Sequence, residues 1–377
     1  MDHSKKVLIL YASAGHGHEK AAKALEETYK QLYPGRAVLC EDVLELASGF
    51  LGSFYESFYL WQIQKLPWLW GIFYHLLDIG PVYRLANAVR RVLNAAMSGR
   101  LETLLIRESP AVVLATHFLP IEVADHLKKK GRISSKLVAV VTDYLPHYIW
   151  TAPTVDFYVV AAEETREALA LKGVDASKIK VLGIPVEPKF SKALSRSSLR
   201  ERFGLSGQAF TVLVTSGGAG IGALALITGK LCEKDSQLQL MVVCGTNAEL
   251  ERNMRALAAR HAGLKVFGFV NNMDELMEAA DLVVGKGGGL TLTESFAKGK
   301  PVVLFRPVPG QESRNGRIVK KNSAGFVTQS PAELADRVYE IAHSAALYAS
   351  LKKRVQKLSR PEASRDIVEL AEHAACH

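Results

Sequence analysis

Residues 285–315 read GKGGGLTLTESFAKGKPVVLFRPVPGQESRN, and this stretch decides the fold class. The preceding run, 281–284 (DLVV), has the composition of a buried strand, and residues 301–305 (PVVLF) form the next one. Between them, three consecutive glycines lead into residues 290–298, which have helical spacing. A glycine-rich turn between a strand and a helix lets the backbone approach a ligand and points free N–H groups at an anion. The stretch therefore predicts an α/β fold with a phosphate-binding turn.

Polar side chains are expected to gather beside that turn. They are Glu294, one turn into the helix, and Gln311, Glu312 and Asn315, in the loop after the next strand. A carboxylate and amides beside a phosphate site suit a nucleotide sugar, with oxygens for the ribose hydroxyls and amides for the sugar. The alternative is that the glycines only make a tight turn.

Length and composition restrict the class of protein. A chain of 377 residues predicts two domains, and a net charge of +9 favours an anionic partner: nucleic acid, a membrane surface or phosphates. The four cysteines show no CxxC and no paired spacing, so we expect neither a zinc site nor a disulfide framework, and a reducing cytoplasm fits. No uninterrupted apolar run reaches about 20 residues, so we expect no transmembrane helix.

A second glycine-rich loop lies near the N-terminus. Residues 6–12 have the pattern of a buried strand, 13–18 (SAGHGH) form the loop and 19–32 form a helix. This order places His18 at a helix N-terminus and at the carboxyl edge of a parallel sheet, where open α/β sheets bind ligands. The positive helix end disfavours an imidazolium, so His18 is expected to stay neutral and to accept a proton. His16 is the reserve candidate, and the alternative is that both are structural.

Residues 50–74 (FLGSFYESFYLWQIQKLPWLWGIFY) are rich in aromatic side chains. They hold three of the chain's four tryptophans, Trp61, Trp68 and Trp70, and few charges. Tyr and Trp at this density suit the headgroup level of a bilayer. The alternative is a core or a dimer interface.

Two cationic groups follow this aromatic segment. They are Arg84, Arg90, Arg91 and Arg100, and then Lys128, Lys129, Lys130, Arg132 and Lys136. Each cation near an anionic membrane contributes on the order of 1 kcal/mol. We therefore expect a peripheral anionic phospholipid surface as a partner, with a solvated face as the alternative. No nucleic-acid-binding motif is present, so we expect no nucleic acid.

The rest of the first half is regular α/β. Strands are expected at 111–116, 136–142, 157–161 and 178–182. Asp143 and His147 follow one of them, and two interpretations stay open: they face the acceptor, or they cap loops. Residues 183–202, with two prolines and several serines, are interpreted as the interdomain linker.

The second half begins the pattern again. Strand 210–215 leads into a third glycine loop, SGGAGIG, with Gly217, Gly218 and Gly220. The order is GGxGxG rather than GxGxxG, and no acidic residue ends the next strand, 238–244, so a dehydrogenase is disfavoured. Two glycine loops can instead hold a diphosphate from two sides. Strand 265–270 ends in a turn with Phe269 and Val270, whose backbone groups could bind a pyrimidine base.

Four segments in collinear order carry a specific resemblance. They are SAGHGHEKAA, SGGAGIG, GFVNNMDELMEAADLVV and GGGLTLTESFAKGKPVVLFRPVPGQESRN. Together they resemble the monogalactosyldiacylglycerol synthase and diacylglycerol glucosyltransferase family, which is related to the N-acetylglucosaminyltransferase of peptidoglycan synthesis. The similarity covers nearly the whole chain.

The resemblance implies a GT-B fold, in which two Rossmann-like domains with parallel sheets face a central cleft. It implies an acceptor-binding, membrane-facing domain at 1–190, a UDP-sugar domain at 191–355, and a C-terminal segment at 356–377 whose helix returns to the first domain. The implied activity is inverting transfer of glucose or galactose from UDP-glucose or UDP-galactose to the sn-3 hydroxyl of diacylglycerol. The implied location is the cytoplasmic side of the cell membrane, as a peripheral protein.

The resemblance also assigns residues. The family's catalytic base matches His18, while His16 stands where a small or amide residue is more usual, so both histidines stay candidates. The ribose-binding glutamate matches Glu294, and the GQE…N element matches Gln311, Glu312 and Asn315. We place the donor pocket at Gly217, Gly218, Gly220, Phe269, Val270, Gly287, Gly288, Gly289, Leu290, Thr291, Glu294, Gln311, Glu312 and Asn315, and the acceptor and membrane surface at Trp61, Trp68, Trp70, Asp143 and His147.

The chemistry needs no metal or other cofactor on this interpretation. The chain has no DxD motif, so no metal site is expected, and helix dipoles and glycine-loop amides would stabilise the diphosphate instead. Two rival interpretations remain. One is an epimerase or transferase of the same fold that acts on a soluble or other lipid substrate. The other is a membrane-binding module without activity.

Overall fold

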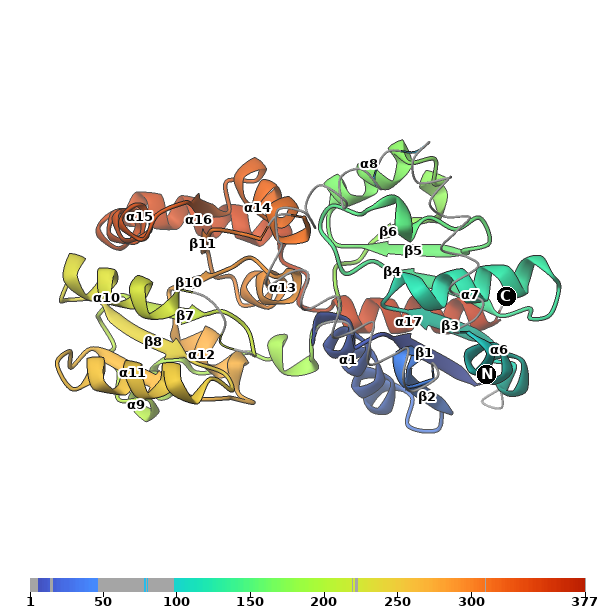
Figure 1. Ribbon diagram of the computed structural model, residues 1–377, viewed down its shortest axis with the longest axis horizontal. Helices are drawn as coiled ribbons and strands as arrows, with labels where there is room; N and C mark the ends of the chain where they lie inside the picture. The colour runs from blue at the N-terminus through green and yellow to red at the C-terminus, as the bar shows by residue number, and fades with distance from the viewer. Residues whose placement is uncertain are drawn as a thin grey trace. The chain divides into compact units, whose positions relative to one another are not determined.

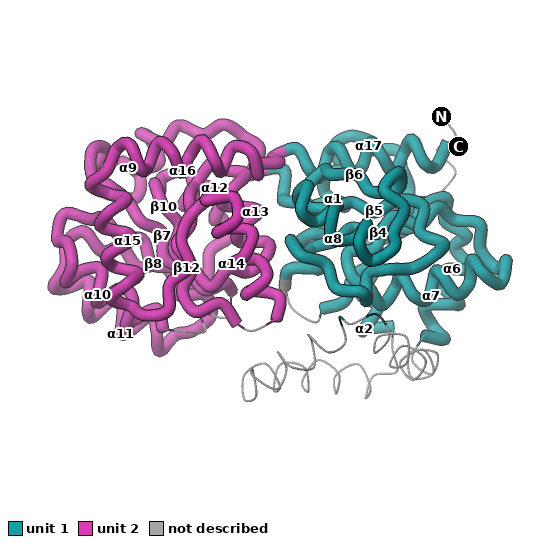
Figure 2. Tube along the Cα trace, turned by 90° about the horizontal axis from the view of Figure 1, so that it is seen from above, with its two compact units in different colours: residues 1–188, 362–377 teal, residues 189–361 magenta. Residues whose placement is uncertain are grey.

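The computed structural model describes residues 6–13, 16–46, 78, 80, 98–218, 220, 223–308 and 310–376. The chain forms two compact units (Figure 2). The first contains Met1–Pro188 together with Glu362–His377, and the second contains Lys189–Pro361.

The first unit is built on a six-stranded sheet in which every strand pairs in parallel, in the order β2-β1-β3-β4-β5-β6. Its strands are β1 (Val7–Tyr11), β2 (Val38–Asp42), β3 (Val112–Ala115), β4 (Lys136–Val140), β5 (Phe157–Val160) and β6 (Ile179–Val181). The chain adds β2 on one side of β1 and β3 on the other side. The strand order therefore reverses between β1 and β3.

Helices cover both faces of this sheet (Figure 1). Because side chains alternate along a strand, Val7 and Ile9 pack with α1 (His16–Leu32) and α17 (Ala363–Cys376). Leu8 and Leu10 point to the opposite face and pack with the remaining helices. These are α2 (Val43–Leu46), α6 (Gly99–Glu108), α7 (Phe118–Lys129) and α8 (Glu163–Leu171), with the 3-10 turn η1 (Tyr148–Trp150). A second 3-10 turn, η2 (Ala176–Lys178), precedes β6.

The second unit repeats this plan with a parallel sheet in the order β12-β11-β10-β7-β8-β9. Its strands are β7 (Thr211–Thr215), β8 (Gln239–Val243), β9 (Leu264–Phe267), β10 (Leu282–Gly285), β11 (Val302–Phe305) and β12 (Gly325–Thr328). Here the strand order reverses between β7 and β10, since β8 and β9 lie on one side of β7 and β10 to β12 on the other.

One core cluster of the second unit lies between one face of this sheet and the helices α10, α11, α15 and α16, and buried side chains of α12, α13 and α14 belong to the rest of its core. Leu224 and Ile227 of α10 and Leu334 and Val338 of α15 pack there against Val214 of β7. The helices of the unit are α9 (Arg196–Arg202), α10 (Leu224–Lys234), α11 (Ala248–Ala258), α12 (Met273–Ala279), α13 (Gly289–Ala297), α14 (Gln311–Lys321), α15 (Pro331–His343) and α16 (Ala345–Leu358), with the 3-10 turn η3 (Pro188–Phe190) at its start.

The predicted α/β fold with parallel sheets is confirmed, and the C-terminal helix belongs to the first unit. β2 and β12, which lie at sheet edges, are not among the strands predicted from the sequence. The linker interpretation of residues 183–202 is wrong in its last part, because α9 occupies Arg196–Arg202. The Ser195 side chain caps that helix, and the guanidinium of the buried Arg200 bonds to Asp281, which local composition does not reveal.

One buried ion pair fastens the C-terminal helix to the first unit. Arg36 Nε donates to Glu372 Oε1 of α17 at 3.0 Å, and the side chains are only 3% and 7% exposed. Nearby, α17 also packs on α1 and on the strands through Ile367 and Val368. The pair thus joins residues that lie 336 positions apart in the sequence.

We predict that Glu372→Ala lowers the free energy of unfolding by about 3–5 kcal/mol, because it leaves the Arg36 guanidinium buried without this partner. Glu369→Ala is the matched control, since it removes the exposed pair with Arg365 on the same helix, which is expected to contribute less than about 1 kcal/mol. Urea unfolding of the full chain measures both. Equal small losses for the two variants would show that the buried pair does not fasten the helix.

Candidate active site

His18 lies where the strand order of the first sheet reverses. It sits in the first turn of α1, just after β1, and its ring reaches the residues that follow β3 and β4. His18 Nδ1 is 2.7 Å from the carbonyl oxygen of Thr116 and 3.0 Å from Oγ1 of Thr142. The Thr116 hydroxyl also donates to the carbonyl oxygen of His18 at 2.9 Å, so backbone and ring are both held.

These contacts decide where the imidazole carries its hydrogen. A carbonyl oxygen can only accept, so Nδ1 must be the donor to Thr116, and the neutral ring then has its lone pair on Nε2. No hydrogen bond to Nε2 of His18 is found among the residues that the structure describes. The ring is therefore prepared to accept a proton at Nε2.

The surroundings of His18 favour the neutral ring. Burial lowers the pKa of His18, while the negative charge of Asp143 and the hydrogen bond to Thr116 oppose that shift. The His117 ring lies edge-on at 4.7 Å between ring centroids, and the Trp150 ring lies at 6.4 Å. The net lowering means that the ring is unprotonated at neutral pH.

Asp143 and His147 both stabilise the loop after β4. Asp143 Oδ2 accepts a hydrogen bond from Trp150 Nε1 at 3.0 Å, and His147 Nδ1 accepts one from Ile149 N at 3.1 Å. Both residues are buried, and His147 caps η1. Of the two, Asp143 also acts on His18 through its charge.

The structure tests the residues predicted for the membrane surface only in part. Trp61, Trp68 and Trp70 are outside the described residues, and of His16 the structure gives only its place at the start of α1. In the second cationic group, Lys128 and Lys129 pair with carboxylates of Asp156 and Asp125, so its local charge is smaller than its composition indicates. No helix within the described ranges combines the length and apolarity needed to cross a bilayer.

The two glycine loops of the second unit follow β7 and β10, where its strand order reverses. The loop after β7 is tightly fastened: a Cβ on Gly220 (φ +59°) would lie 2.0 Å from the Cys244 carbonyl oxygen. Gly217 has a φ of +82°, and the Gly218 carbonyl accepts from Thr246 N at 2.9 Å. Only glycine allows the loop after β7 to approach the loop after β8, at Cys244 to Thr246, this closely.

The loop after β10 leads directly into α13. Gly287 has a φ of +93°, Gly288 is the N-cap and Gly289 begins the helix. The first N–H groups of α13, including those of Leu290 and Thr291, have no partner within the helix, as at every helix start. Together with the positive helix end, these N–H groups suit an anion.

Gln311, Glu312 and Asn315 lie on the helix α14, so the prediction that they lie in a loop is wrong. Asn315, fully buried, donates from Nδ2 to the Gly287 carbonyl at 3.0 Å, so its amide positions the turn. Glu312 accepts from Val308 N at 2.9 Å, and burial raises the pKa of its carboxyl against the effects of that bond and of Lys286. Glu294 is buried on α13, and Gln311 begins α14.

Phe269 and Val270 follow an edge strand of the sheet, whereas the glycine loops follow β7 and β10. They follow β9, and β7 and β8 separate β9 from β10. Phe269 is 61% exposed, so its side chain is available on the surface of the second unit.

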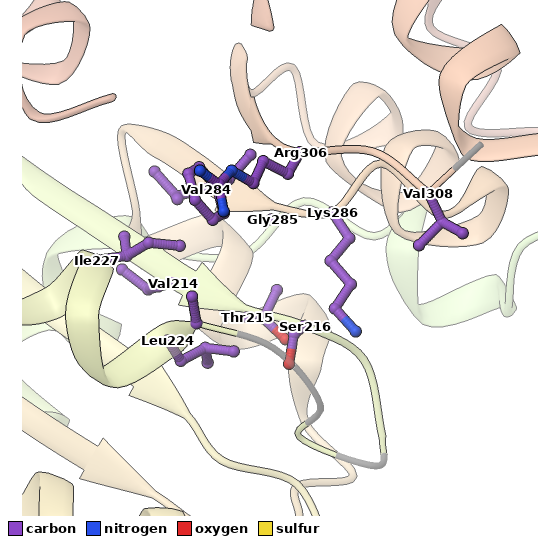
Figure 3. Close-up of a pocket in the computed structure, with 12 residues that line it drawn as sticks. Val214, Thr215, Ser216, Leu224, Ile227, Val284, Gly285, Lys286, Arg306 and Val308 are labelled. Carbon is purple, nitrogen blue, oxygen red and sulfur yellow. The ribbon is translucent and has the colours of Figure 1, made fainter. Parts of the chain in front are cut away.

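A cavity of about 220 Å³ opens between the ends of β7 and β10 (Figure 3). Its walls come from α10 and the strands, with Leu224, Ile227 and Val284, and its polar residues include Ser216 and Lys286. Neither these two residues nor Thr116 and Thr142 were predicted to belong to a site from the sequence. The signal that could have identified them is position, because each lies at or just beyond the end of a parallel strand. Among the described residues, no three His, Cys, Asp or Glu side chains form a group suited to a metal ion.

Comparison with known proteins assigns both halves of the chain. Residues 18–186 match the model for monogalactosyldiacylglycerol (MGDG) synthase, and residues 211–372 match the glycosyltransferase family 28 C-terminal domain. A processive diacylglycerol beta-glucosyltransferase of Bacillus subtilis is 31% identical over 373 residues, covering 98% of this chain and 95% of the relative.

Solved structures share the fold. MurG of Acinetobacter baumannii superposes with a TM-score of 0.62 at 14% identity, over 98% of this chain and 99% of that one. Anabaena Alr3699/HepE in complex with UDP-glucose gives 0.56 at 16% identity, over 98% and 100%. The predicted GT-B fold is confirmed, and the chain belongs to glycosyltransferase family 28, among the monogalactosyldiacylglycerol synthases and diacylglycerol beta-glucosyltransferases.

Proposed function

We propose that this protein is an inverting glycosyltransferase that moves glucose from UDP-glucose to the sn-3 hydroxyl of diacylglycerol. Support comes from relatives named diacylglycerol beta-glucosyltransferases, which align over 98% of the chain. The geometry of His18 carries the proposal. Its Nδ1 is bound to the Thr116 carbonyl, so Nε2 offers a lone pair at the carboxyl edge of the sheet.

His18 acts as the general base. Nε2 takes the proton of the acceptor hydroxyl while that oxygen forms a bond to the anomeric carbon, and the bond from that carbon to the UDP oxygen breaks on the opposite face. The electron pair of the broken bond goes to the diphosphate. Attack opposite the leaving group inverts the anomeric centre and gives a beta-glycoside from an alpha-linked donor.

The diphosphate binds at the glycine turns of the second unit. The free N–H groups at the start of α13, together with the positive helix end, stabilise its negative charge, as helix N-termini do for phosphates. We propose that this arrangement works without a metal ion. Asn315, which bonds to Gly287, keeps the turn in the conformation that it needs.

The acceptor is a lipid, so the protein must reach a membrane surface. We propose peripheral binding to anionic phospholipid on the cytoplasmic side, supported by the net charge of +9 and by the aromatic segment at residues 50–74.

We predict that purified protein, given diacylglycerol in anionic liposomes, makes a labelled glycolipid from labelled UDP-glucose and much less from UDP-galactose. Thin-layer chromatography of the lipid extract measures this, and slower-migrating bands would show that further sugars are added. Tight UDP binding without a labelled lipid from either donor would favour the rival interpretation, a transferase or epimerase that acts on another substrate.

We predict that His18→Ala lowers the transfer rate about 10²- to 10⁴-fold, as expected for loss of a general base, and changes the Kd for UDP by no more than a few-fold. His126→Ala is the control, because that side chain is exposed on α7. Loss of UDP binding in a folded His18→Ala protein would contradict the role as base.

We predict that kcat/KM is constant near pH 7 and falls in acid, at a pH below the ordinary pKa of histidine, because burial lowers the pKa of His18. Asp143→Asn should move this acid limb to still lower pH, since the carboxylate raises the pKa of His18 and its charge is removed. An asparagine oxygen can still accept the hydrogen bond from Trp150. Asp175→Asn, an exposed change in the same unit, should leave the profile unchanged, and a shift to higher pH in Asp143→Asn would contradict the assignment.

A further inference from the structure

Two polar side chains, those of Ser216 and Lys286, line the cavity between β7 and β10. Ser216 Oγ is buried and has no hydrogen-bonding partner among the residues that the structure describes. Lys286 lines the same cavity, and within the described part of the chain its Nζ makes no hydrogen bond or ion pair. In Figure 3 the ends of both side chains point to the same side of the cavity.

The setting of Lys286 makes an unpartnered ammonium costly. Apolar side chains of Leu224, Ile227 and Val308 line the cavity, and burial lowers the pKa of Lys286, which the charge of Glu312 only partly opposes. A cation that is withdrawn from water is stabilised when an anion and hydrogen-bond acceptors take the place of the water. The site therefore suits a negatively charged ligand.

The position of the two residues in the chain indicates which ligand that is. Ser216 directly precedes Gly217, and Lys286 directly precedes Gly287, so each side chain lies beside one of the two glycine turns. The turns belong to neighbouring parallel strands at the point where the strand order reverses. The cavity that both side chains line therefore lies at residues that immediately precede the two glycine turns.

We propose that Lys286 and Ser216 bind the diphosphate of the nucleotide-sugar donor and that the Lys286 ammonium stabilises the charge of the departing UDP. This inference rests on the proposed function of the same site. As the bond between the anomeric carbon and the diphosphate oxygen breaks, its electron pair moves onto that oxygen. A fixed ammonium in a partly apolar site stabilises this charge more strongly than it would in water.

The test compares UDP with uridine, which has the base and ribose but no phosphate. Lys286→Met keeps most of the side-chain volume and removes the charge. We expect it to weaken UDP binding about 10- to 100-fold, the range for loss of a charge-assisted hydrogen bond, and to leave uridine binding unchanged. Ser216→Ala should weaken UDP binding about 3- to 10-fold, again without an effect on uridine.

Controls separate this role from general effects. Lys230→Met removes one exposed charge in the second half of α10 and should change neither Kd. Lys286→Arg keeps a cation and should recover part of the UDP affinity. If Lys286→Met does not fold, the comparison of UDP with uridine in Lys286→Arg and Ser216→Ala carries the same test.

The outcomes distinguish this inference from the proposed function. Unchanged UDP binding in Lys286→Met, or equal weakening of UDP and uridine, would overturn the inference while the transferase activity stands. Failure of the unaltered protein to bind UDP would overturn the proposed function itself. A larger fall in kcat than in UDP affinity for Lys286→Met would support a role in stabilising the departing diphosphate.

Discussion

The sites of this protein depend on one constraint, the parallel pairing of strands at the point where the strand order reverses. In the first unit this pairing joins β1 to β3, and in the second it joins β7 to β10. In the first unit the chain leaves β1 for α1 on one face of the sheet and leaves β3 for α7 on the other. The loops after β1 and β3 therefore turn to opposite faces of the sheet. The crevice between them is where open α/β sheets bind ligands.

The glycines are a consequence of how closely the loops approach at these points. A Cβ on Gly220 would meet the Cys244 carbonyl oxygen at 2.0 Å, and one on Gly245 would meet the Gly218 carbonyl oxygen at 2.1 Å. The loop after β7 and the loop after β8 are thus held against each other by their backbones. Asn247 Nδ2, which donates to the Gly220 carbonyl at 3.2 Å, adds a side-chain contact. Backbone N–H groups fixed in this way need little reorganisation when charge develops beside them.

Local sequence was sufficient to predict most of the strands and the sheet edge at which the site lies. It was not sufficient to predict contacts between residues that are distant in the sequence. The apolar runs predicted β3 and β10, and the glycines placed His18 at a carboxyl edge. The sequence could not show that Asn315 would bond to Gly287, because that contact joins positions 28 residues apart through two intervening elements. For the same reason the Thr116 carbonyl, 98 residues from His18, could not be recognised as the group that sets its tautomer.

Burial lowers the pKa of one basic side chain in each unit, but the chemical consequence differs between the two units. It lowers the pKa of His18 in the first unit and of Lys286 in the second, since a low-dielectric setting disfavours a positive charge. For a histidine, whose ordinary pKa is about 6.5, this lowering yields a neutral ring that can take a proton at physiological pH. The ordinary pKa of a lysine is about four units higher than that of a histidine. The cost of burying its charge therefore favours binding of an anion before it favours loss of the proton. Burial thus lowers the pKa of two basic side chains that lie where the strand order of each sheet reverses, and it leaves a neutral ring in the first unit and a cation suited to an anion in the second.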